Sequence, residues 1–229
     1  MKATLKFVGL RRAVGDLNRA SKFYSDILGL APIELKDGQK SFQRPGWELK
    51  LVAGAVGGYT SGWLTFAVPK LSESCAKLAS IGVRYSELIP PWLEEGARLA
   101  RFFDPDGLML QYEESSGPTG GRDDIVLGVT DVTKAVRAYS RGFSLEVIRN
   151  QNMFAELSIQ NGPVLCLIKV EKVLGSPGVL LFQGSKVKDT TRLLENSGFS
   201  ILGHPVKTHG GKILNARDAF GNPIELTLA

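Results

Sequence analysis

The sequence has few of the residues that most often build metal centres, disulfide frameworks and acid–base sites. Its 229 residues include two cysteines, Cys75 and Cys166, and two histidines, His204 and His209. Two cysteines on apolar stretches form neither a disulfide framework nor a zinc cluster, so we expect them to be small buried hydrophobic residues. This cysteine content fits a protein of the reducing cytoplasm. The two histidines severely limit any metal site or acid–base mechanism.

Several other function classes lack their signatures. No apolar run approaches the roughly 20 residues of a membrane-spanning helix, so we expect no membrane partner. The formal charge of +5 is scattered, without the basic stripe interleaved with aromatics that nucleic-acid binding requires. A Ser-His-Asp set, a Cys-His set, a P-loop and a G-x-G-x-x-G motif are all missing. The hydrophobic content of 43% and charged content of 22% predict one large or two small folded domains.

The clearest positive feature is an internal repeat that spans the chain. The segment VGDLNRASKFYSDILGL matches VTDVTKAVRAYSRGFSL, and DPDGLMLQ from Asp104 matches DAFGNPIE from Asp218. The offset stays between 114 and 116 residues along the whole half, which indicates a tandem duplication. A fainter repeat inside each half, with helical patterns that open at Leu17 and Leu71, indicates four units in all.

Each unit has the pattern of a strand, a helix and three further strands. Apolar residues recur at helical spacing after Asp16 and again after Asp131, and both aspartates are suitable N-caps. Alternation around Leu64–Val68 is typical of a half-buried strand. Turn pairs such as Asn161-Gly162 predict hairpins between the later strands. The sequence therefore predicts the α+β class, built from four βαβββ units.

A stretch rich in serine, glycine, proline and charge, Glu113–Asp124, separates the two halves. Such a composition is typical of a linker. We expect a first domain over residues 1–116, a linker over 117–122 and a second domain over 123–229, with two units in each domain. One face of each sheet then packs on helices, and the other face forms a cup.

The segments VGDLNRASKFYSDILGL, FFDPDGLMLQ, VTDVTKAVRAYS and DAFGNPIELTL resemble the vicinal oxygen chelate superfamily of glyoxalases, bleomycin resistance proteins and extradiol dioxygenases. The resemblance covers nearly the whole chain and implies two tandem glyoxalase-like domains. Units could pair within each half, or the halves could pair with each other as glyoxalase I subunits do. The superfamily includes isomerases, lyases, dioxygenases, transferases and drug binders, so the fold does not specify the activity.

The resemblance also implies where a metal would be held. Members that use a metal place its ligands on the first strands of two partner units and on the strand after the DPDG-type turn. In the first half these positions fall on Phe7 or Gly9, on Trp63 and on Gln111. None of these side chains is ionic, and the indole cannot ligate a metal. We therefore expect no metal in the first half.

In the second half the corresponding positions fall on Asp124, Val179 and Glu225. Two carboxylates can hold Mg²⁺ or Mn²⁺ together with waters, whereas a two-His-one-carboxylate iron site is not supported. His209 precedes the turn that leads to Glu225, a place where extradiol dioxygenases carry a catalytic histidine. A loop histidine in solvent is the alternative interpretation.

Strand phase predicts which side chains line the cups as ligand-binding residues. These candidates are Phe7, Arg11, Trp63, Arg101, Gln111, Gln183 and Asn215. Two guanidiniums, on Arg11 and Arg101, near Trp63 and Gln111 would suit a planar acidic or aromatic ligand. Solvation of both arginines at the surface is the alternative.

Two functional hypotheses follow. The preferred one is a protein without a cofactor that binds a small aromatic or acidic organic ligand in a concave cleft, for sequestration or for chemistry that needs only shape and hydrogen bonds. The other is a metal-dependent lyase, isomerase or dioxygenase with Mn, Mg, Fe or Zn at Asp124 and Glu225, in which Glu225 and His209 are catalytic. Whether the protein is an enzyme stays open.

The expected partner in both cases is a small-molecule ligand or substrate. A third hypothesis, a scaffold whose cup binds another chain, has no exposed apolar stripe in the sequence to support it. We expect a cytoplasmic monomer or homodimer.

Overall fold

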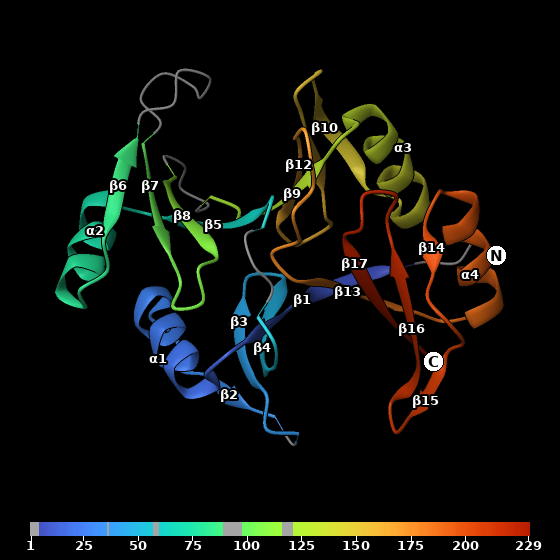
Figure 1. The fold of residues 1–229 in the computed structure, drawn as a ribbon, viewed down its shortest axis with the longest axis horizontal. Helices are drawn as coiled ribbons and strands as arrows, with labels where there is room; N and C mark the ends of the chain where they lie inside the picture. The colour runs from blue at the N-terminus through green and yellow to red at the C-terminus, as the bar shows by residue number, and fades with distance from the viewer. Residues whose placement is uncertain (1–4, 36, 57–59, 89–97, 116–120) are drawn as a thin grey trace.

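The computed structural model describes residues 5–35, 37–56, 60–88, 98–115 and 121–229. Four units follow one another along this part of the chain, each with a strand, a helix and further strands (Figure 1). This order confirms the predicted α+β class and the repeated βαβββ unit. No helix in the described ranges is long and apolar enough to cross a membrane.

The first unit contains β1 (Lys6–Val14), α1 (Leu17–Leu28), β2 (Ile33–Glu34), β3 (Lys40–Arg44) and β4 (Trp47–Ala53). The second contains β5 (Trp63–Val68), α2 (Leu71–Ser80), β6 (Tyr85–Leu88), β7 (Leu99–Phe103) and β8 (Met109–Glu114). The third contains β9 (Asp124–Val129), α3 (Val132–Phe143), β10 (Glu146–Asn150), β11 (Phe154–Ser158) and β12 (Val164–Lys169). The fourth contains β13 (Val179–Gly184), α4 (Val187–Asn196), β14 (Ser200–Ile201), β15 (Val206–Thr208), β16 (Gly211–Arg217) and β17 (Pro223–Leu228).

Two helices begin where the sequence predicts. The Asp16 carboxylate accepts a hydrogen bond from the Arg19 amide at 2.9 Å, and Asp131 accepts one from the Lys134 amide at 2.8 Å. These bonds satisfy amide groups that have no partner inside the first helical turn. Gly29 ends α1 in the left-handed conformation, with φ of 68°, which glycine adopts without strain.

The units pair across the two halves of the chain. Sheet A joins the first and fourth units in the order β14-β16-β17-β13-β1-β4-β3-β2, with β15 on β16. Sheet B joins the second and third units in the order β10-β11-β12-β9-β5-β8-β7-β6. Of the two pairings that the sequence leaves open, the structure has the one between halves. The predicted linker at 117–122 lies mostly outside the described residues, and the domain boundary stays a prediction.

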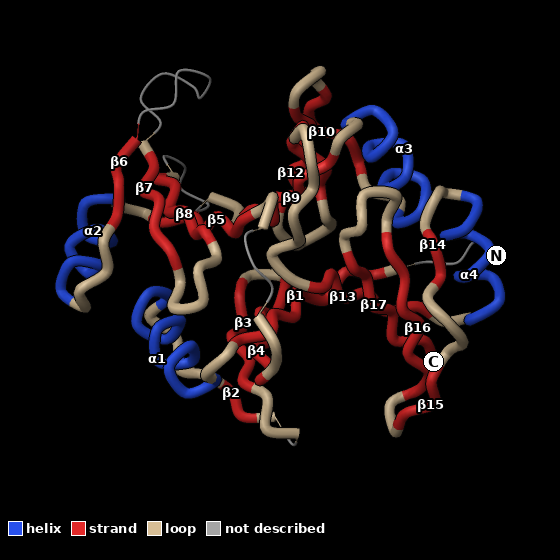
Figure 2. The backbone as a smooth tube through the Cα atoms, in the orientation of Figure 1, coloured by secondary structure: helices blue, strands red, loops and turns tan. Residues whose placement is uncertain are grey.

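The two sheets lie one above the other, with α1 and α2 at one end and α3 and α4 at the other (Figures 1 and 2). The outer strands of sheet A reach toward the bottom of this view and those of sheet B toward the top. The concave faces therefore point in opposite directions. Apolar residues from both sheets and all four helices form one continuous buried cluster, which leaves the concave faces free for polar side chains.

Two corresponding polar contacts join the sheets. Tyr24 on α1 donates to Asp104 in the β7–β8 turn at 3.0 Å, and Tyr139 on α3 donates to Asp218 in the β16–β17 turn at 3.0 Å. Helix α1 packs on sheet A and α3 on sheet B, whereas each turn belongs to the other sheet. Burial raises the pKa of both tyrosines well above the ordinary value, and the neighbouring aspartates add to the increase.

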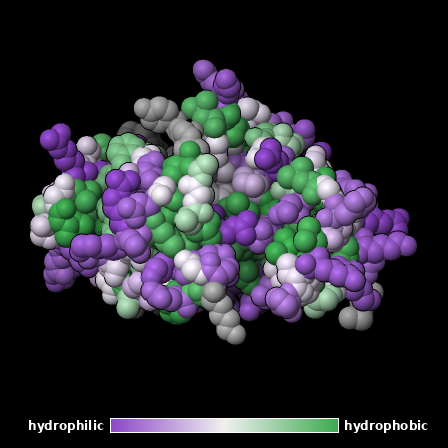
Figure 3. Space-filling model, turned by 60° about the horizontal axis from the view of Figure 1, so that its bottom comes forward, coloured by the Kyte–Doolittle hydropathy of each residue, from purple (hydrophilic) through white to green (hydrophobic). Residues whose placement is uncertain are grey.

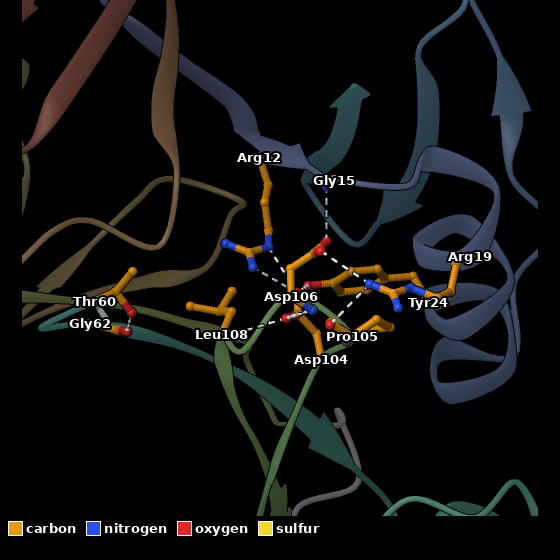
Figure 4. A network of polar contacts seen from close by, with 10 residues as sticks. All are labelled: Arg12, Gly15, Arg19, Tyr24, Thr60, Gly62, Asp104, Pro105, Asp106 and Leu108. Atoms are coloured by element: carbon orange, nitrogen blue, oxygen red, sulfur yellow. Dashed lines mark hydrogen bonds and ion pairs between the residues drawn. The ribbon is translucent and has the colours of Figure 1, made fainter. Parts of the chain in front are cut away.

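The two contacts differ in charge. Arg12 donates to Asp104 through Nε at 2.9 Å and lies 2.8 Å away through Nη2, which makes the first contact a buried ion pair (Figure 4). In the repeat, Leu127 stands where the first half has Arg12. Asp218 instead accepts from the Asn222 side-chain amide at 2.8 Å.

A third link between the sheets centres on Asp123, which is 6% exposed. Its carboxylate accepts two bonds from Arg44, at 2.8 and 2.6 Å, and one from the Trp47 indole at 3.0 Å. It also accepts the amide of Ala67 on β5 at 3.1 Å. Asp123 therefore fixes the β3–β4 hairpin of sheet A against the central strand of sheet B.

Candidate functional site

The concave face of sheet A contains a cavity of about 400 Å³. Strand β1, its neighbours β4 and β13, and the strands β17 and β16 beyond β13 supply most of the lining. The segment after β2 supplies the rest. Figure 3 brings this side forward, and its surface is hollowed near the middle, where hydrophilic and hydrophobic residues lie side by side. The lining residues are Arg11, Leu35, Asp37, Gln39, Lys50, Leu181, Ile213 and Glu225.

An ion pair lies in this cavity. Arg11 Nη1 is 2.8 Å from Glu225 Oε2, and their side chains are 29% and 13% exposed. Strand register explains the contact, because Arg11 lies opposite Val179 in β13 and Glu225 lies opposite Leu181 of the same strand. The rest of the Arg11 guanidinium makes no hydrogen bond to a described residue, so it can bind a further acceptor.

A second cation lies beside Arg11. Lys50 is its direct neighbour in the parallel pairing of β1 and β4, and Lys50 Nζ is 3.2 Å from Glu48 Oε2. Ser41 donates to the same glutamate. The cavity therefore combines two cations that are each paired with a carboxylate, the further carboxylate of Asp37, and the apolar side chains of Leu181 and Ile213.

The concave face of sheet B has a different set of side chains. Arg101, Gln111, Thr65 and Asp124 lie directly opposite one another on the adjacent strands β7, β8, β5 and β9. Arg101 Nε donates to Gln111 Oε1 at 3.2 Å, and its guanidinium lies 5.7 Å from the centre of the Trp63 ring. These contacts fix the orientation of Gln111 and of the indole.

Carboxylates gather on the same face. Burial raises the pKa of Asp124 well above the ordinary value, and Glu113, Glu156 and Asp123 raise it further. Burial and Glu156 also raise the pKa of Glu113. The pKa of the Cys166 thiol is raised well above its usual value by burial and then by the same carboxylates. Of the two cysteines predicted to be buried, Cys75 is buried and Cys166 is only partly buried.

The family profile of the Glyoxalase/Bleomycin resistance protein/Dioxygenase superfamily matches residues 6–112. This match covers the first half of the chain, the part that contains the first two units. Glyoxalase I from Zea mays has the same fold, with a TM-score of 0.79 and 19% identity over 98% of this chain and 92% of that one. A putative dioxygenase from Bacillus subtilis has a TM-score of 0.71 and 17% identity over 100% of this chain and 86% of that one. A comparison with curated protein sequences gives no match. At these identities the two structures establish the fold and leave the activity open.

The superfamily's metal positions in sheet A do not suit a divalent ion. They hold Gly9, Val179 and Glu225, so only one of them is ionic. That carboxylate already pairs with Arg11, whose positive charge would repel a metal cation at the same oxygen atoms.

The positions in sheet B do not suit one either. The Trp63 indole has no ligating lone pair, and the Gln111 amide oxygen is bonded by Arg101. Asp124 is then the single ionic group at these positions. In the described part of the chain, no three His, Cys, Asp or Glu residues lie close enough together to hold a metal.

The structure corrects the predicted grouping of metal and catalytic residues. Asp124 lies on β9 in sheet B, whereas Glu225 lies on β17 in sheet A. His209 is exposed in the turn between β15 and β16. The three residues belong to the same half of the sequence, but the units of one half do not share a sheet.

The same pairing separates the two arginines that were predicted to act together. Arg11 is in sheet A with Glu225, and Arg101 is in sheet B with Trp63 and Gln111. On sheet A, Asn215 lies opposite Glu225 and is exposed, and Gln183 is exposed on β13.

Phe7 is not in the cavity, contrary to the prediction. It is 5% exposed, and its ring packs edge-on against Phe182 at 5.4 Å between ring centres. The register of β1 against β13 shifts between Phe7 and Gly9. Such a bulge reverses the alternation of side chains, so Phe7 faces the core while Gly9 and Arg11 face the cavity.

Strand phase within one half missed several polar residues of the two concave faces. Lys50 and Glu48 are on β4, which pairs in parallel with β1, the strand that carries Arg11. The sequence repeat does not reveal this pairing. Glu156 is on β11 of the third unit and meets Glu113 of the second unit only because units pair across halves. Alternation in WELKLV could have placed Glu48 and Lys50 on one face.

Proposed function

We propose that this protein binds a small acidic organic molecule in the cavity of sheet A, and that binding needs no divalent metal. The observation that carries the proposal is the Arg11–Glu225 ion pair inside a concave cavity of about 400 Å³. A cavity of this size suits a small-molecule ligand. Glu225 of this ion pair stands at a position where the resemblance to the superfamily implies a metal ligand.

The cavity residues would contact different parts of the ligand. The guanidinium of Arg11 has donors left for a ligand carboxylate, and a planar fork matches a carboxylate better than a point charge does. Lys50 adds a second positive charge beside it. Leu181 and Ile213 provide apolar contact for the body of the ligand, and Glu225 can accept a hydrogen bond from a hydroxyl or amine group.

The alternative, a metal-dependent lyase, isomerase or dioxygenase, gains less support. Its three residues, Asp124, His209 and Glu225, lie on β9, in an exposed turn and on β17, respectively. Glu225 is in addition paired with Arg11. The cations of this cavity are therefore Arg11 and Lys50.

Metal independence can be measured directly. The protein is refolded with Fe, Zn, Mn or Ni, dialysed, and analysed for bound elements. We expect no stoichiometric metal and unchanged ligand affinity after treatment with EDTA. One tightly bound equivalent that Glu225→Gln removes would overturn the proposal.

Ligand binding can be tested with carboxylate probes. Benzoate and aliphatic monocarboxylates are titrated into the labelled protein and followed by NMR, with benzyl alcohol as the neutral probe. Because a charge-assisted hydrogen bond contributes about 1.5–3 kcal/mol, Arg11→Met should weaken benzoate binding roughly ten- to hundredfold. Arg192→Met, at an exposed position on α4, is the matched control and should bind benzoate as the wild type does. Equal affinities of wild type and Arg11→Met would contradict the proposal.

A further inference from the structure

The cavity of sheet A has carboxylates as well as cations in its lining. Asp37 and Glu225 are the two acidic residues among those that line it. Glu225 pairs with Arg11, and Lys50 pairs with Glu48. Within the described ranges Asp37 bonds to Gln39 and forms no ion pair. A ligand that carries only negative charge leaves this carboxylate unbalanced, whereas a ligand with an added positive group can pair with it.

A tight turn between β2 and β3 holds Asp37. The Leu35 amide donates to the Gln39 carbonyl at 2.9 Å, and the Gly38 amide donates to the Leu35 carbonyl at 3.0 Å. The backbone amide of Gln39 donates to Asp37 Oδ1 at 3.4 Å, and the Gln39 side-chain amide donates to Oδ2. A carboxylate has about four acceptor positions, so Asp37 can still accept hydrogen bonds from a ligand.

Asp37 and Arg11 border the cavity from different parts of sheet A. Arg11 is on β1, and β4 lies between β1 and β3, whose hairpin with β2 carries Asp37. Neighbouring strands are about 4.8 Å apart, so the backbones of β1 and β3 are roughly 10 Å apart. Both side chains nevertheless line one cavity of about 400 Å³. A ligand that contacts both therefore carries its charged groups at its two ends.

Lys50 lies between these two residues along the sheet. It is opposite Arg11 in β1 and opposite Ser41 in β3. Its Nζ is 3.2 Å from Glu48 Oε2, so its charge already has a partner. Lys50 can therefore support the carboxylate end of a ligand without excluding an ammonium group at Asp37.

We propose that the ligand of the sheet A cavity is an amino carboxylate with its charges at opposite ends, and that Asp37 selects it by binding the ammonium group. This inference rests on the proposed function, because the carboxylate end binds Arg11. The ammonium group donates hydrogen bonds to Asp37. Leu35 of the same turn, which also lines the cavity, provides apolar contact for the chain between the two ends.

The probes are two pairs of compounds that differ in one group. They are 6-aminohexanoate with 6-hydroxyhexanoate, and 4-aminobutanoate with 4-hydroxybutanoate. Each is titrated into labelled protein at low salt and followed by NMR. In at least one pair we expect the amino compound to bind about three- to fivefold tighter than the hydroxy compound, as for an ion pair at an exposed carboxylate.

Two variants assign this preference. Asp37→Asn should abolish it and leave the affinity for the hydroxy compounds unchanged. Glu195→Gln, at an exposed position on α4, is the matched control and should keep the wild-type preference.

Two outcomes overturn the inference. One is that the wild type binds neither amino compound more tightly than its hydroxy counterpart. The other is that the preference persists unchanged in folded Asp37→Asn. Arg11→Met tests the proposed function separately, because it should weaken the binding of amino and hydroxy compounds alike. Equal affinities of wild type and Arg11→Met for all four compounds would contradict the proposed function, whatever Asp37→Asn does.

Discussion

Asp124 on β9 and Glu225 on β17 are the ionic residues at the implied metal positions of sheets B and A, and they have opposite surroundings. Glu225 Oε2 is 2.8 Å from Arg11 Nη1, so a cation lies directly beside this carboxylate. Asp124 has carboxylates for neighbours, and burial together with these neighbours raises its pKa. One duplicated architecture thus gives one carboxylate a cation and leaves the other beside further carboxylates.

The raised pKa of Asp124 predicts how stability depends on pH. Because the folded-state pKa is above the unfolded value, this group contributes full stability below the unfolded pKa, near 4, and loses it as pH rises through the folded pKa. Asp124→Asn removes this loss. The free energy of unfolding of the variant, relative to that of the wild type, should therefore increase as pH rises from 4 to 8. Urea unfolding at several pH values measures the difference.

Glu195→Gln provides the control for that series, since Glu195 is exposed on α4. Its free energy of unfolding should follow the wild type at every pH. If the difference in free energy of unfolding between Asp124→Asn and wild type stays constant from pH 4 to 8, the pKa of Asp124 is not raised in the folded state.

At the scale of elements, two hairpin turns meet where the sheets approach each other. The β3–β4 turn contains Gly46, with φ of 77°, and a Cβ atom there would overlap the backbone carbonyl oxygen of Asn161 in the β11–β12 turn. The first turn belongs to sheet A and the second to sheet B. Glycine is therefore needed at residue 46 for its conformation and also for the close approach of two backbones.

Gly38 and Gly46 separate these two requirements. Gly38 has nearly the same φ, 76°, but nothing lies within 4 Å of a Cβ atom there. Gly38→Ala should lower the free energy of unfolding by roughly 1 kcal/mol, the cost of a left-handed conformation. Gly46→Ala should lower it by about 3 kcal/mol or more, because the turn must also move. Chemical denaturation of both variants tests this, and equal losses would contradict the contact.

The elements themselves could be predicted from the sequence, whereas their partners could not. Local signals such as the Asp16 and Asp131 caps and the Asn161-Gly162 turn depend on neighbouring residues, and they appear in the structure as expected. The bulge that turns Phe7 into the core depends on how β1 meets β13, about 170 residues later in the chain. Strand alternation within one segment has no information about such a distant partner, so the prediction that Phe7 lines the cavity failed.

At the scale of the whole molecule, each sheet is shared between the two halves of the chain. Both sheets are held together at an antiparallel pair formed by strands from different halves, β1 with β13 and β5 with β9. The tyrosine–aspartate contacts link the sheets within each half, Tyr24 to Asp104 and Tyr139 to Asp218. If one half were absent, the central strands of the other half would lose these partners. They would then be unpaired apolar strands at the edge of a sheet.

Residues 1–116 and 123–229 should therefore not fold as separate monomers. Each fragment contains half of sheet A and half of sheet B, and it loses the partner of two central strands. We expect each fragment alone to be unfolded or aggregated by circular dichroism and light scattering, and an equimolar mixture to recover the native far-UV spectrum as a one-to-one complex. A stable folded monomer of residues 1–116 would contradict this prediction and would support the domain division read from the sequence.

The sharing of sheets also constrains how this gene can change. Because each concave face contains strands of both copies, a deletion of either copy would remove half of each face. A substitution in a single unit, in contrast, alters only one of the two faces, because each unit belongs to one sheet. Substitutions of Arg11 in the first unit and of Asp124 in the third therefore change different faces.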